Sequence, residues 1–207
     1  MNEQKEVWSQ LIAGPRSEDL LRGVMERVAR SLSDMIGQIV TNGVPTVKKI
    51  PITQVVARAG APEAEIVGIY LNIESGLRGR VILILPFNFA LNLIDLVMDA
   101  PRGTTTRLGL EERSALAEVG NLMLSYFLNS VVELVGWSDV LQPSPPSVVV
   151  DMLGAILNLC VTSAAAVSDD LLVIETIFKD VVRTVQFRFW VLPDPSIDWA
   201  SALGEVN

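Results

Sequence analysis

The sequence predicts an α+β protein in which two related halves share one continuous, mainly antiparallel sheet, with two long helices on its outside. Two observations carry this prediction. A long amphipathic helix followed by three strand-like runs occurs twice, offset by about 95 residues. The linkers between the strands are mostly too short for helical crossovers, so neighbouring strands are expected to run antiparallel. With 207 residues, the chain (1–207) fits one domain made of two fused halves, at about 17–100 and 107–193, between short terminal tails.

The first half is expected to begin with a helix from about Ser17 to Val40. Ser17 is a typical N-cap residue, two acidic residues follow it, and apolar residues then recur at helical spacing. Gly43 and Pro45 end this pattern. Turn sequences separate three runs of high strand propensity, and a short helix follows them. The strand-like runs are ITQVVARA (52–59), EIVGIYLNI (65–73) and GRVILIL (79–85), and the short helix is ALNLIDLVMD (90–99).

In the second half, a polar connector at 101–106 leads to a long helix from about Leu110 to Gly136. The most hydrophobic stretch of the chain follows at 147–168, and its length suggests a membrane span. Because it contains Asp151 and Asn158, we expect it to divide into a short strand and a buried helix. The last two strand-like runs are LLVIETIF (171–178) and VRTVQFRFWVL (182–192).

Composition excludes several classes of function. The chain has 24 acidic and 16 basic residues, a net charge of −8 and no basic run, so neither nucleic acid nor an anionic membrane is an expected partner. Histidine is absent, which removes the commonest metal ligand and the commonest general base. The single cysteine, Cys160, fits a reducing compartment and is expected to be a small core residue. The N-terminal residues lack a signal-peptide pattern, so a cytoplasmic location is expected.

The most informative motif lies on the second long helix and in the loop after it. On a helix with about 100° per residue, Ser114, Glu118 and Asn121 fall within about 60° of one another, while apolar residues gather on the opposite side. A carboxylate and a carboxamide therefore share one solvent-facing patch. Pro143 follows twenty-two residues after Asn121.

The pattern Ser, three residues, Glu, two residues, Asn, about twenty-one residues, Pro resembles the signature of the CheC/CheX/FliY family of response-regulator phosphatases. The likeness extends from about Ser17 to Pro193 and includes the stretches VPTVKKIPITQVV and GNLMLSYFLNSVVELVG. It implies a CheC-like fold and hydrolysis of the aspartyl-phosphate on a CheY-type receiver domain in bacterial chemotaxis. The receiver domain would bring its own Mg²⁺, and this chain is expected to hold no metal or cofactor.

The resemblance assigns the chemistry to Glu118 and Asn121. A carboxamide can hold the attacking water without adding charge beside the phosphoryl oxygens, which suits Asn121. Glu118 is implied to pair with a lysine of the receiver domain and so to orient the helix. Ser114 is expected at the rim of the site or as a support of the helix. Pro143 is expected to shape the loop that leaves the helix, although the proline cluster there equally fits a plain turn.

The first long helix carries a degenerate version of this motif. At the offset of about 95 residues, the positions of the motif are occupied by Asp19, Gly23 and Glu26. Gly23 has no side chain, and Glu26 places a carboxylate where the second helix has an amide. A formal charge about 4 Å from a phosphoryl group would repel it by roughly 4 kcal/mol at an effective dielectric constant near 20. We therefore expect one working site, in the second half.

Two apolar residues, Leu128 and Val132, project toward the site side of the second helix, within about 80° of Asn121. They are either covered by the chain's own loop or available to a docking receiver domain, and the sequence leaves both alternatives open.

The favoured function is therefore a phosphatase. The alternative is a non-catalytic adaptor that resembles the middle domain of flagellar switch proteins or a CheC-type partner of the CheD deamidase. A small-molecule enzyme that uses Glu118 as a general base has the least support, because no second catalytic group accompanies this residue.

Overall fold

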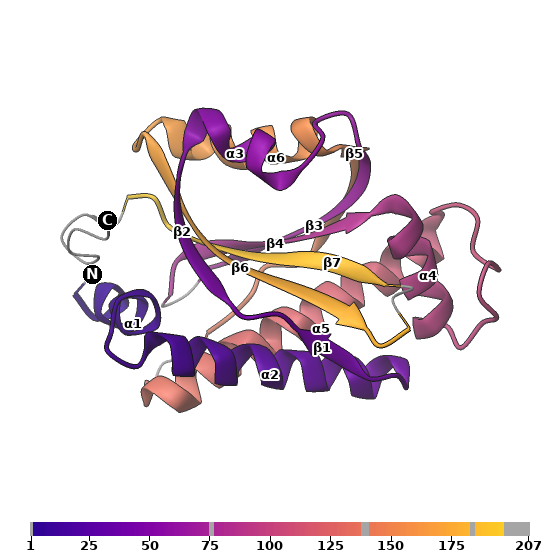
Figure 1. Ribbon diagram of the computed structural model, residues 1–207, viewed down its shortest axis with the longest axis horizontal. Helices are drawn as coiled ribbons and strands as arrows, with labels where there is room; N and C mark the ends of the chain where they lie inside the picture. The colour runs from indigo at the N-terminus through magenta and orange to yellow at the C-terminus, as the bar shows by residue number, and fades with distance from the viewer. Residues whose placement is uncertain (1, 75–76, 138–140, 183–184, 197–207) are drawn as a thin grey trace.

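The structure is a computed structural model that describes residues 2–74, 77–137, 141–182 and 185–196. A seven-stranded sheet forms its middle layer, with helices on both faces (Figure 1). The helices are α1 (Asn2–Ile12), α2 (Ser17–Ile36), the 3-10 helix η1 (Ile52–Gln54), α3 (Val55–Ala59), α4 (Phe87–Val97), α5 (Leu110–Val135) and α6 (Leu153–Ala165). The strands are β1 (Val40–Asn42), β2 (Thr46–Pro51), β3 (Glu65–Ile73), β4 (Gly79–Pro86), β5 (Ser147–Met152), β6 (Asp170–Asp180) and β7 (Gln186–Pro193).

The two halves exchange their outer strands. The strand order is β1-β6-β7-β4-β3-β5, with β2 also pairing with β6, and the pairings between described strands are antiparallel, as predicted. Strand β2 of the first half thus pairs with β6 of the second, and β5 of the second half pairs with β3 of the first. The two registers correspond, because Thr46 faces Glu175 as Ser147 faces Tyr70. This exchange joins the halves into one sheet.

The main core lies between the sheet and the long helices. Figure 1 shows α2 and α5 beside each other beneath the sheet, with α1 next to α2. Residues of β3 and β4 alternate between the two faces of the sheet, as the period of two in a strand requires. On this face the two strands contribute Val67, Ile69, Leu71, Ile73, Val81, Leu83 and Leu85. The two long helices therefore cover one face of the sheet together.

A smaller core fills the opposite face, beneath α3 and α6 (Figure 1). Its members include Ile66, Ile82, Ile84, Ile156, Cys160 and Trp190. Cys160 is 2% exposed, and its burial raises the pKa of the thiol. The prediction of a small core residue is confirmed.

The prediction of a strand at 52–59 is wrong. These residues form η1 and α3, and the first long strand of this half is β2 instead. Helix α3 buries Val55 and Ala59, which are four residues apart and so lie on one side of a helix. Strand β2 lies at the edge of the sheet and exposes Lys48 and Lys49. Because lysines are common on edge strands but lower the hydrophobicity of the segment, the sequence pattern did not indicate a strand here.

The residues expected to form an N-terminal tail instead form α1. Val7, Trp8 and Leu11 are buried in the main core, and the indole Nε1 of Trp8 donates a hydrogen bond to the carbonyl of Arg78 at 3.2 Å. The other predicted helices begin and end within a few residues of the observed bounds. Positions 183–184 of the last predicted strand lie outside the described residues.

One described helix, α5, has the length and hydropathy of a membrane-crossing helix, with a mean hydropathy of 1.2 over its most apolar window. Half of that window is buried within the fold. The apolar stretch at 147–168 divides into β5 and α6, as predicted.

Candidate functional site

Helix α5 lies directly on strand β3. A Cβ atom added to Gly120 would lie 2.7 Å from Cγ2 of Ile69 and 3.4 Å from Cδ1 of Leu71. The absence of a side chain at Gly120 therefore allows the helix to approach the strand closely. The position next in the chain is Asn121, so the close approach fixes where this candidate residue lies relative to the sheet.

Both ends of α5 are well defined. At the first turn, the Glu112 carboxylate accepts a hydrogen bond from the Gly109 backbone N–H at 2.9 Å. At the last turn, Gly136 adopts the left-handed conformation with φ 73°, which favours glycine. These caps keep the 26 residues between them in one continuous helix.

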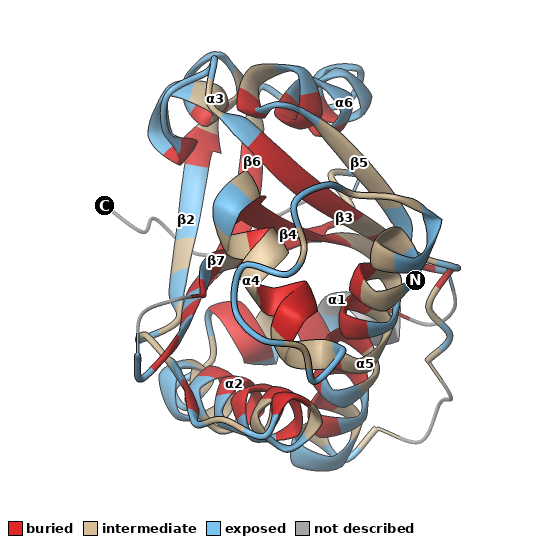
Figure 2. Ribbon diagram, turned by 90° about the vertical axis from the view of Figure 1, so that its right-hand side faces the viewer, coloured by how far each residue is buried: buried red, intermediate tan, exposed pale blue. Residues whose placement is uncertain are grey.

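The polar side chains of the motif lie on the outer side of α5. Ser114 and Glu118 are exposed, and Asn121 is partly exposed. The hydroxyl of Ser114 donates to the carbonyl of Leu110 at 2.9 Å, so it is bonded to its own helix. The opposite side of α5 is completely buried at Leu116, Val119, Met123 and Phe127. Figure 2 shows this division into a buried and an exposed side.

Pro143 lies at the end of β3 rather than within β5. It forms an isolated bridge with Ile73, which stands two residues beyond Leu71, a residue close to Gly120. Backbone hydrogen bonds on both sides hold this pairing, from Glu74 N–H to the Gln142 carbonyl and from Ser144 N–H to the Asn72 carbonyl. Residues 142–144, which follow α5 in the chain, are thereby joined to the strand on which α5 lies.

Arg113 makes a contact between α5 and β5 that the sequence did not predict. Its Nη1 donates to the carbonyl of Val148 on β5 at 3.1 Å, and so connects the first turns of α5 with the edge strand. Nothing in the sequence pattern indicates this contact, because the partner is a backbone atom from another segment.

The burial patterns of the two long helices support the offset of 95 residues. Seven buried residues of α2 correspond at that offset to seven buried residues of α5. These pairs are Leu21 and Leu116, Val24 and Val119, Met25 and Gly120, Val28 and Met123, Ala29 and Leu124, Leu32 and Phe127, and Ile36 and Val131.

The corresponding positions of α2 lack the groups of the motif. Asp19 and Glu26 are exposed. Gly23 faces α5, since a Cβ added there would lie 3.5 Å from Cδ1 of Leu134. These three positions of α2 therefore hold carboxylates at Asp19 and Glu26 but no carboxamide beside them.

Leu128 is not available to a docking partner, which corrects one of the two alternatives for this residue. It is 1% exposed and belongs to the main core. The helical wheel placed it near the edge of the site, but packing against the rest of the fold covers it. Val132 is partly exposed.

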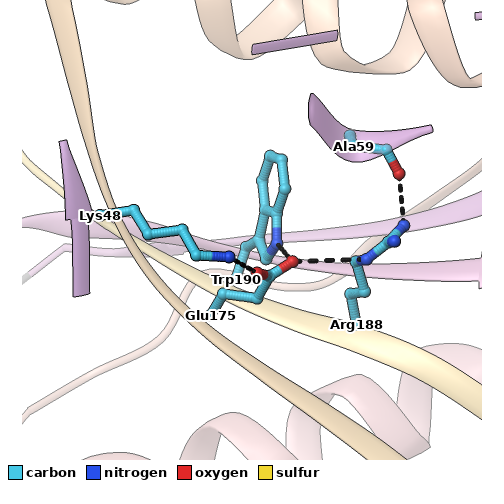
Figure 3. A network of polar contacts seen from close by, with 5 residues as sticks. All are labelled: Lys48, Ala59, Glu175, Arg188 and Trp190. Atoms are coloured by element: carbon cyan, nitrogen blue, oxygen red, sulfur yellow. Dashed lines mark hydrogen bonds and ion pairs between the residues drawn. The ribbon is translucent and has the colours of Figure 1, made fainter. Parts of the chain in front are cut away.

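A second polar cluster lies on the opposite face of the sheet, and Figure 3 shows its contacts. Glu175 pairs with Lys48 and with Arg188 Nε at 3.3 Å, and accepts a hydrogen bond from Trp190 Nε1 at 3.0 Å. Arg188 also donates to the carbonyl of Ala59. Burial alone would raise the pKa of Glu175, but hydrogen bonds from Lys48 and Trp190 lower it below its ordinary value. This cluster connects three strands and α3.

The part of the chain that the structure describes contains no group of three or more His, Cys, Asp or Glu side chains arranged to hold a metal ion. The motif on α5 offers a carboxylate, a carboxamide and a hydroxyl, which suit the positioning of a water molecule or a partner's side chain.

No protein-family model matches the chain. It is 25% identical over 170 residues to the CheY-P phosphatase CheC of Bacillus subtilis, covering 80% of each protein. Among solved structures, it is similar to FliY of Thermotoga maritima with a TM-score of 0.68 and 20% identity, covering 100% of this chain and 98% of that one.

Two further structural neighbours are complexes. One contains CheX and CheY with BeF₃ and Mg²⁺ from Borrelia burgdorferi, with a TM-score of 0.55, 14% identity, and coverage of 86% and 99%. The other is the FliG–FliM complex from Helicobacter pylori, with a TM-score of 0.58, 11% identity, and coverage of 99% and 100%. The chain is therefore similar in sequence to CheC and shares its fold with FliY, CheX and FliM structures.

Proposed function

We propose that the protein hydrolyses the aspartyl-phosphate of a CheY-type response regulator in the cytoplasm, through the single site on α5. One observation carries the proposal. Glu118 and Asn121 lie on the outer side of a helix whose opposite side is buried, so both side chains are open to a docking protein. The likeness to a CheY-P phosphatase and to a CheX–CheY complex supports a CheY-type partner.

In this proposal Asn121 positions the attacking water. Its carboxamide oxygen accepts a hydrogen bond from the water, and its N–H₂ group donates one, without placing a formal charge beside the phosphoryl oxygens. Positioning supplies much of the catalysis in phosphoryl transfer, because the reaction needs an in-line water and stabilised oxygens rather than a covalent step on the enzyme.

Glu118 orients the two proteins. It stands three residues before Asn121 on the same side of α5, and a carboxylate there pairs with a lysine of the receiver domain. Ser114 is bonded back to Leu110, so we assign it to support of the helix rather than to the reaction.

The metal belongs to the partner in this proposal. Mg²⁺ and the phosphoryl group arrive with the phosphorylated receiver, and the present chain adds only side chains that orient water and partner. Removal of Mg²⁺ therefore acts through the receiver and leaves the fold of this protein unchanged.

The test is the rate of phosphate loss from a phosphorylated receiver domain encoded in the same genome, with and without this protein. A rate that rises in proportion to the protein concentration supports the proposal. A rate that stays at the spontaneous value, at concentrations where binding is measurable, contradicts it.

The alternative function is a non-catalytic adaptor. The FliG–FliM neighbour spans 99% of the chain, which supports a binding role for the same architecture. Loss of the motif from α2 agrees with it, because that helix keeps its packing without the chemistry. An adaptor would bind the receiver domain, or a CheD-type deamidase, and leave the rate of phosphate loss unchanged.

A further inference from the structure

A cavity lies away from α5, on the face of the sheet covered by α6. It has a volume of about 520 Å³, within the usual range for small-molecule sites. Its walls come from the end of β3, the start of β4, the second half of α6 and the end of β7. Ile73, Val167, Leu171, Leu192 and Pro193 make part of the lining apolar.

Arg80 is a charged group of this cavity that is bonded to two neighbouring side chains. Its Nε donates to Oδ1 of Asn72 at 3.2 Å, and its Nη1 donates to the hydroxyl of Ser163 at 3.3 Å. A guanidinium has five N–H donors, and these two bonds use only two of them, so donors remain for another acceptor. Two neutral side chains thus fix the orientation of the group without neutralising its charge.

Arg188 is the counterpart of Arg80 in the second half. Each arginine stands on an inner strand, Arg80 opposite Asn72 on β3 and Arg188 opposite Ile177 on β6. Each also donates a hydrogen bond to the small helix above it, Arg188 to Ala59 of α3 and Arg80 to Ser163 of α6. Arg188 lines a cavity as well, of about 240 Å³.

The two arginines differ in their counter-ions. Arg188 pairs with Glu175, which lies two residues before Ile177 on β6 (Figure 3). The equivalent position on β3, two residues before Asn72, holds Tyr70, whose burial raises the pKa of its hydroxyl. The thiol of Cys160 near Arg80 also has a pKa raised by burial, so both groups remain neutral. Within the described ranges, Arg80 forms no ion pair.

We propose that the cavity beneath α6 binds a small organic carboxylate, whose carboxylate group pairs with the Nη end of Arg80 and so serves as the counter-ion that Glu175 is for Arg188. The apolar lining takes the body of the ligand. A carboxylate is assigned rather than a phosphate because the equivalent arginine in the same fold pairs with a carboxylate, and the Nη atoms of Arg80 carry N–H groups beyond the one bonded to Ser163.

Net charge does not drive this binding. Glu74 and Asp194 line the cavity together with Arg78 and Arg80, so these four formal charges cancel. Recognition depends instead on the fixed guanidinium and on the apolar wall. The site should therefore distinguish a carboxylate from a neutral molecule of the same shape.

Calorimetric titration of the full chain with hexanoate tests the proposal, with hexanamide as the neutral isostere and hexyl phosphate as the competing anion. We expect saturable binding of hexanoate, and at least tenfold weaker binding of both other probes. Arg80→Gln should weaken hexanoate binding at least tenfold, whereas Arg107→Gln, at an exposed arginine outside the cavity lining, should leave it unchanged.

A third variant tests the role of the counter-ion. Tyr70→Glu supplies an internal carboxylate at the position equivalent to Glu175, so it should abolish hexanoate binding while the melting curve shows a folded protein. The proposal is overturned if hexanoate shows no saturable binding, if hexanamide or hexyl phosphate binds as tightly as hexanoate, or if Arg80→Gln binds hexanoate as the wild type does.

Discussion

Gly120 on α5 and Ile69 on β3 are in direct contact, and no side chain larger than hydrogen fits between them. A Cβ atom at Gly120 would lie 2.7 Å from Cγ2 of Ile69, closer than carbon atoms approach in folded proteins. Both residues are completely or nearly completely buried, so neither can move into solvent. The helix that carries Glu118 and Asn121 is therefore seated on the sheet through a glycine.

Gly120→Ala is expected to destabilise the protein by about 1–2 kcal/mol. The added methyl group must displace the helix or the strand, which costs about 1–3 kcal/mol, and the gain in helix propensity offsets up to about 1 kcal/mol of this. Urea denaturation of the wild type and the variant measures the difference. Because the site residues stand on the displaced helix, the variant should also lose the proposed acceleration of phosphate loss while it is still folded.

Gly23→Ala is the matched control, at a glycine inside the other long helix. A Cβ there would lie 3.5 Å from Cδ1 of Leu134, which is ordinary van der Waals contact. This variant should therefore gain helix propensity and be stabilised by up to about 1 kcal/mol. Equal destabilisation by both substitutions would show that the contact with Ile69 does not decide the effect at Gly120.

Asp95 holds the connector between the halves, and its replacement should weaken the fold at neutral pH. The side chain is 1% exposed, and its two oxygens accept the backbone N–H groups of Gly103 at 2.6 Å and Thr105 at 2.8 Å. Asp95→Asn replaces one accepting oxygen with a donor, so we expect a loss of about 2–3 kcal/mol in the free energy of unfolding at pH 7.

The pH dependence of that loss follows from the pKa of Asp95. Burial alone would raise this pKa, but the hydrogen bonds from Thr105, together with those from the backbone at Gly103 and Thr104, lower it below its ordinary value. The contribution is present above about pH 4, near the unfolded pKa, and is lost as the pH falls through the lower folded pKa. Wild type and Asp95→Asn should therefore converge in acid. A difference that does not shrink between pH 7 and pH 3 would contradict this account.

The Glu175 cluster should contribute measurably to stability, unlike the exposed ion pair between the long helices. The side chain of Glu175 is 15% exposed and serves three donors, so Glu175→Gln is expected to cost about 1–2 kcal/mol, with allowance for the solvent around Lys48. Arg27 and Glu133 pair at 2.5 Å, but the Glu133 side chain is 67% exposed. Denaturation of Glu133→Gln should give no measurable change, and equal effects of the two substitutions would refute the distinction.

Thr176 offers a route to a more stable protein. Its side chain is 1% exposed in β6, and its hydroxyl has no hydrogen-bond partner among the described residues. Thr176→Val keeps the shape and removes the buried hydroxyl, so we expect stabilisation of about 1 kcal/mol. Thr176→Ser keeps the hydroxyl and removes the methyl group, and should instead destabilise by about 1 kcal/mol. A lower melting temperature for Thr176→Val than for the wild type would show that the hydroxyl is bonded in solution.

The long helices and inner strands could be predicted because their sequences are locally consistent with the structure. In α5, the buried residues recur at helical spacing from Leu116 to Phe127, and in β3 apolar residues fill both faces. The prediction of a strand at 52–59 is wrong because the local sequence there disagrees with the structure. The β-branched residues of this segment favour a strand, but packing against α6 makes it a helix, so tertiary contacts override the local preference.

The candidate site divides in the same way. Helical spacing alone predicts that Ser114, Glu118 and Asn121 lie on one side of a helix. In the structure all three stand on α5 and are exposed or partly exposed. The burial of Leu128 and the contact from Arg113 to β5 depend on which segments pack beside the helix. The exchange of β2 and β5 between the halves likewise requires knowledge of strand order, which short linkers do not specify.

Asn121→Ala should lower the rate of phosphate hydrolysis on the order of 100-fold, or about 2.7 kcal/mol of barrier, because the water loses its positioning group. Asn121→Asp should be no better, since a carboxylate about 4 Å from the phosphoryl group repels it by roughly 4 kcal/mol at an effective dielectric constant near 20. Asn129→Ala is the matched control, at an exposed asparagine two turns further along α5. Its rate should equal that of the wild type.

The central claim is tested most directly by the dephosphorylation rate of a phosphorylated CheY-type receiver with wild type and with the Glu118→Ala/Asn121→Ala double variant, both verified as folded. The account predicts that the wild type accelerates phosphate loss and that the double variant leaves the spontaneous rate. If the double variant accelerates phosphate loss as the wild type does, or if neither does although the wild type binds the receiver, the assignment of a phosphatase site to α5 is contradicted.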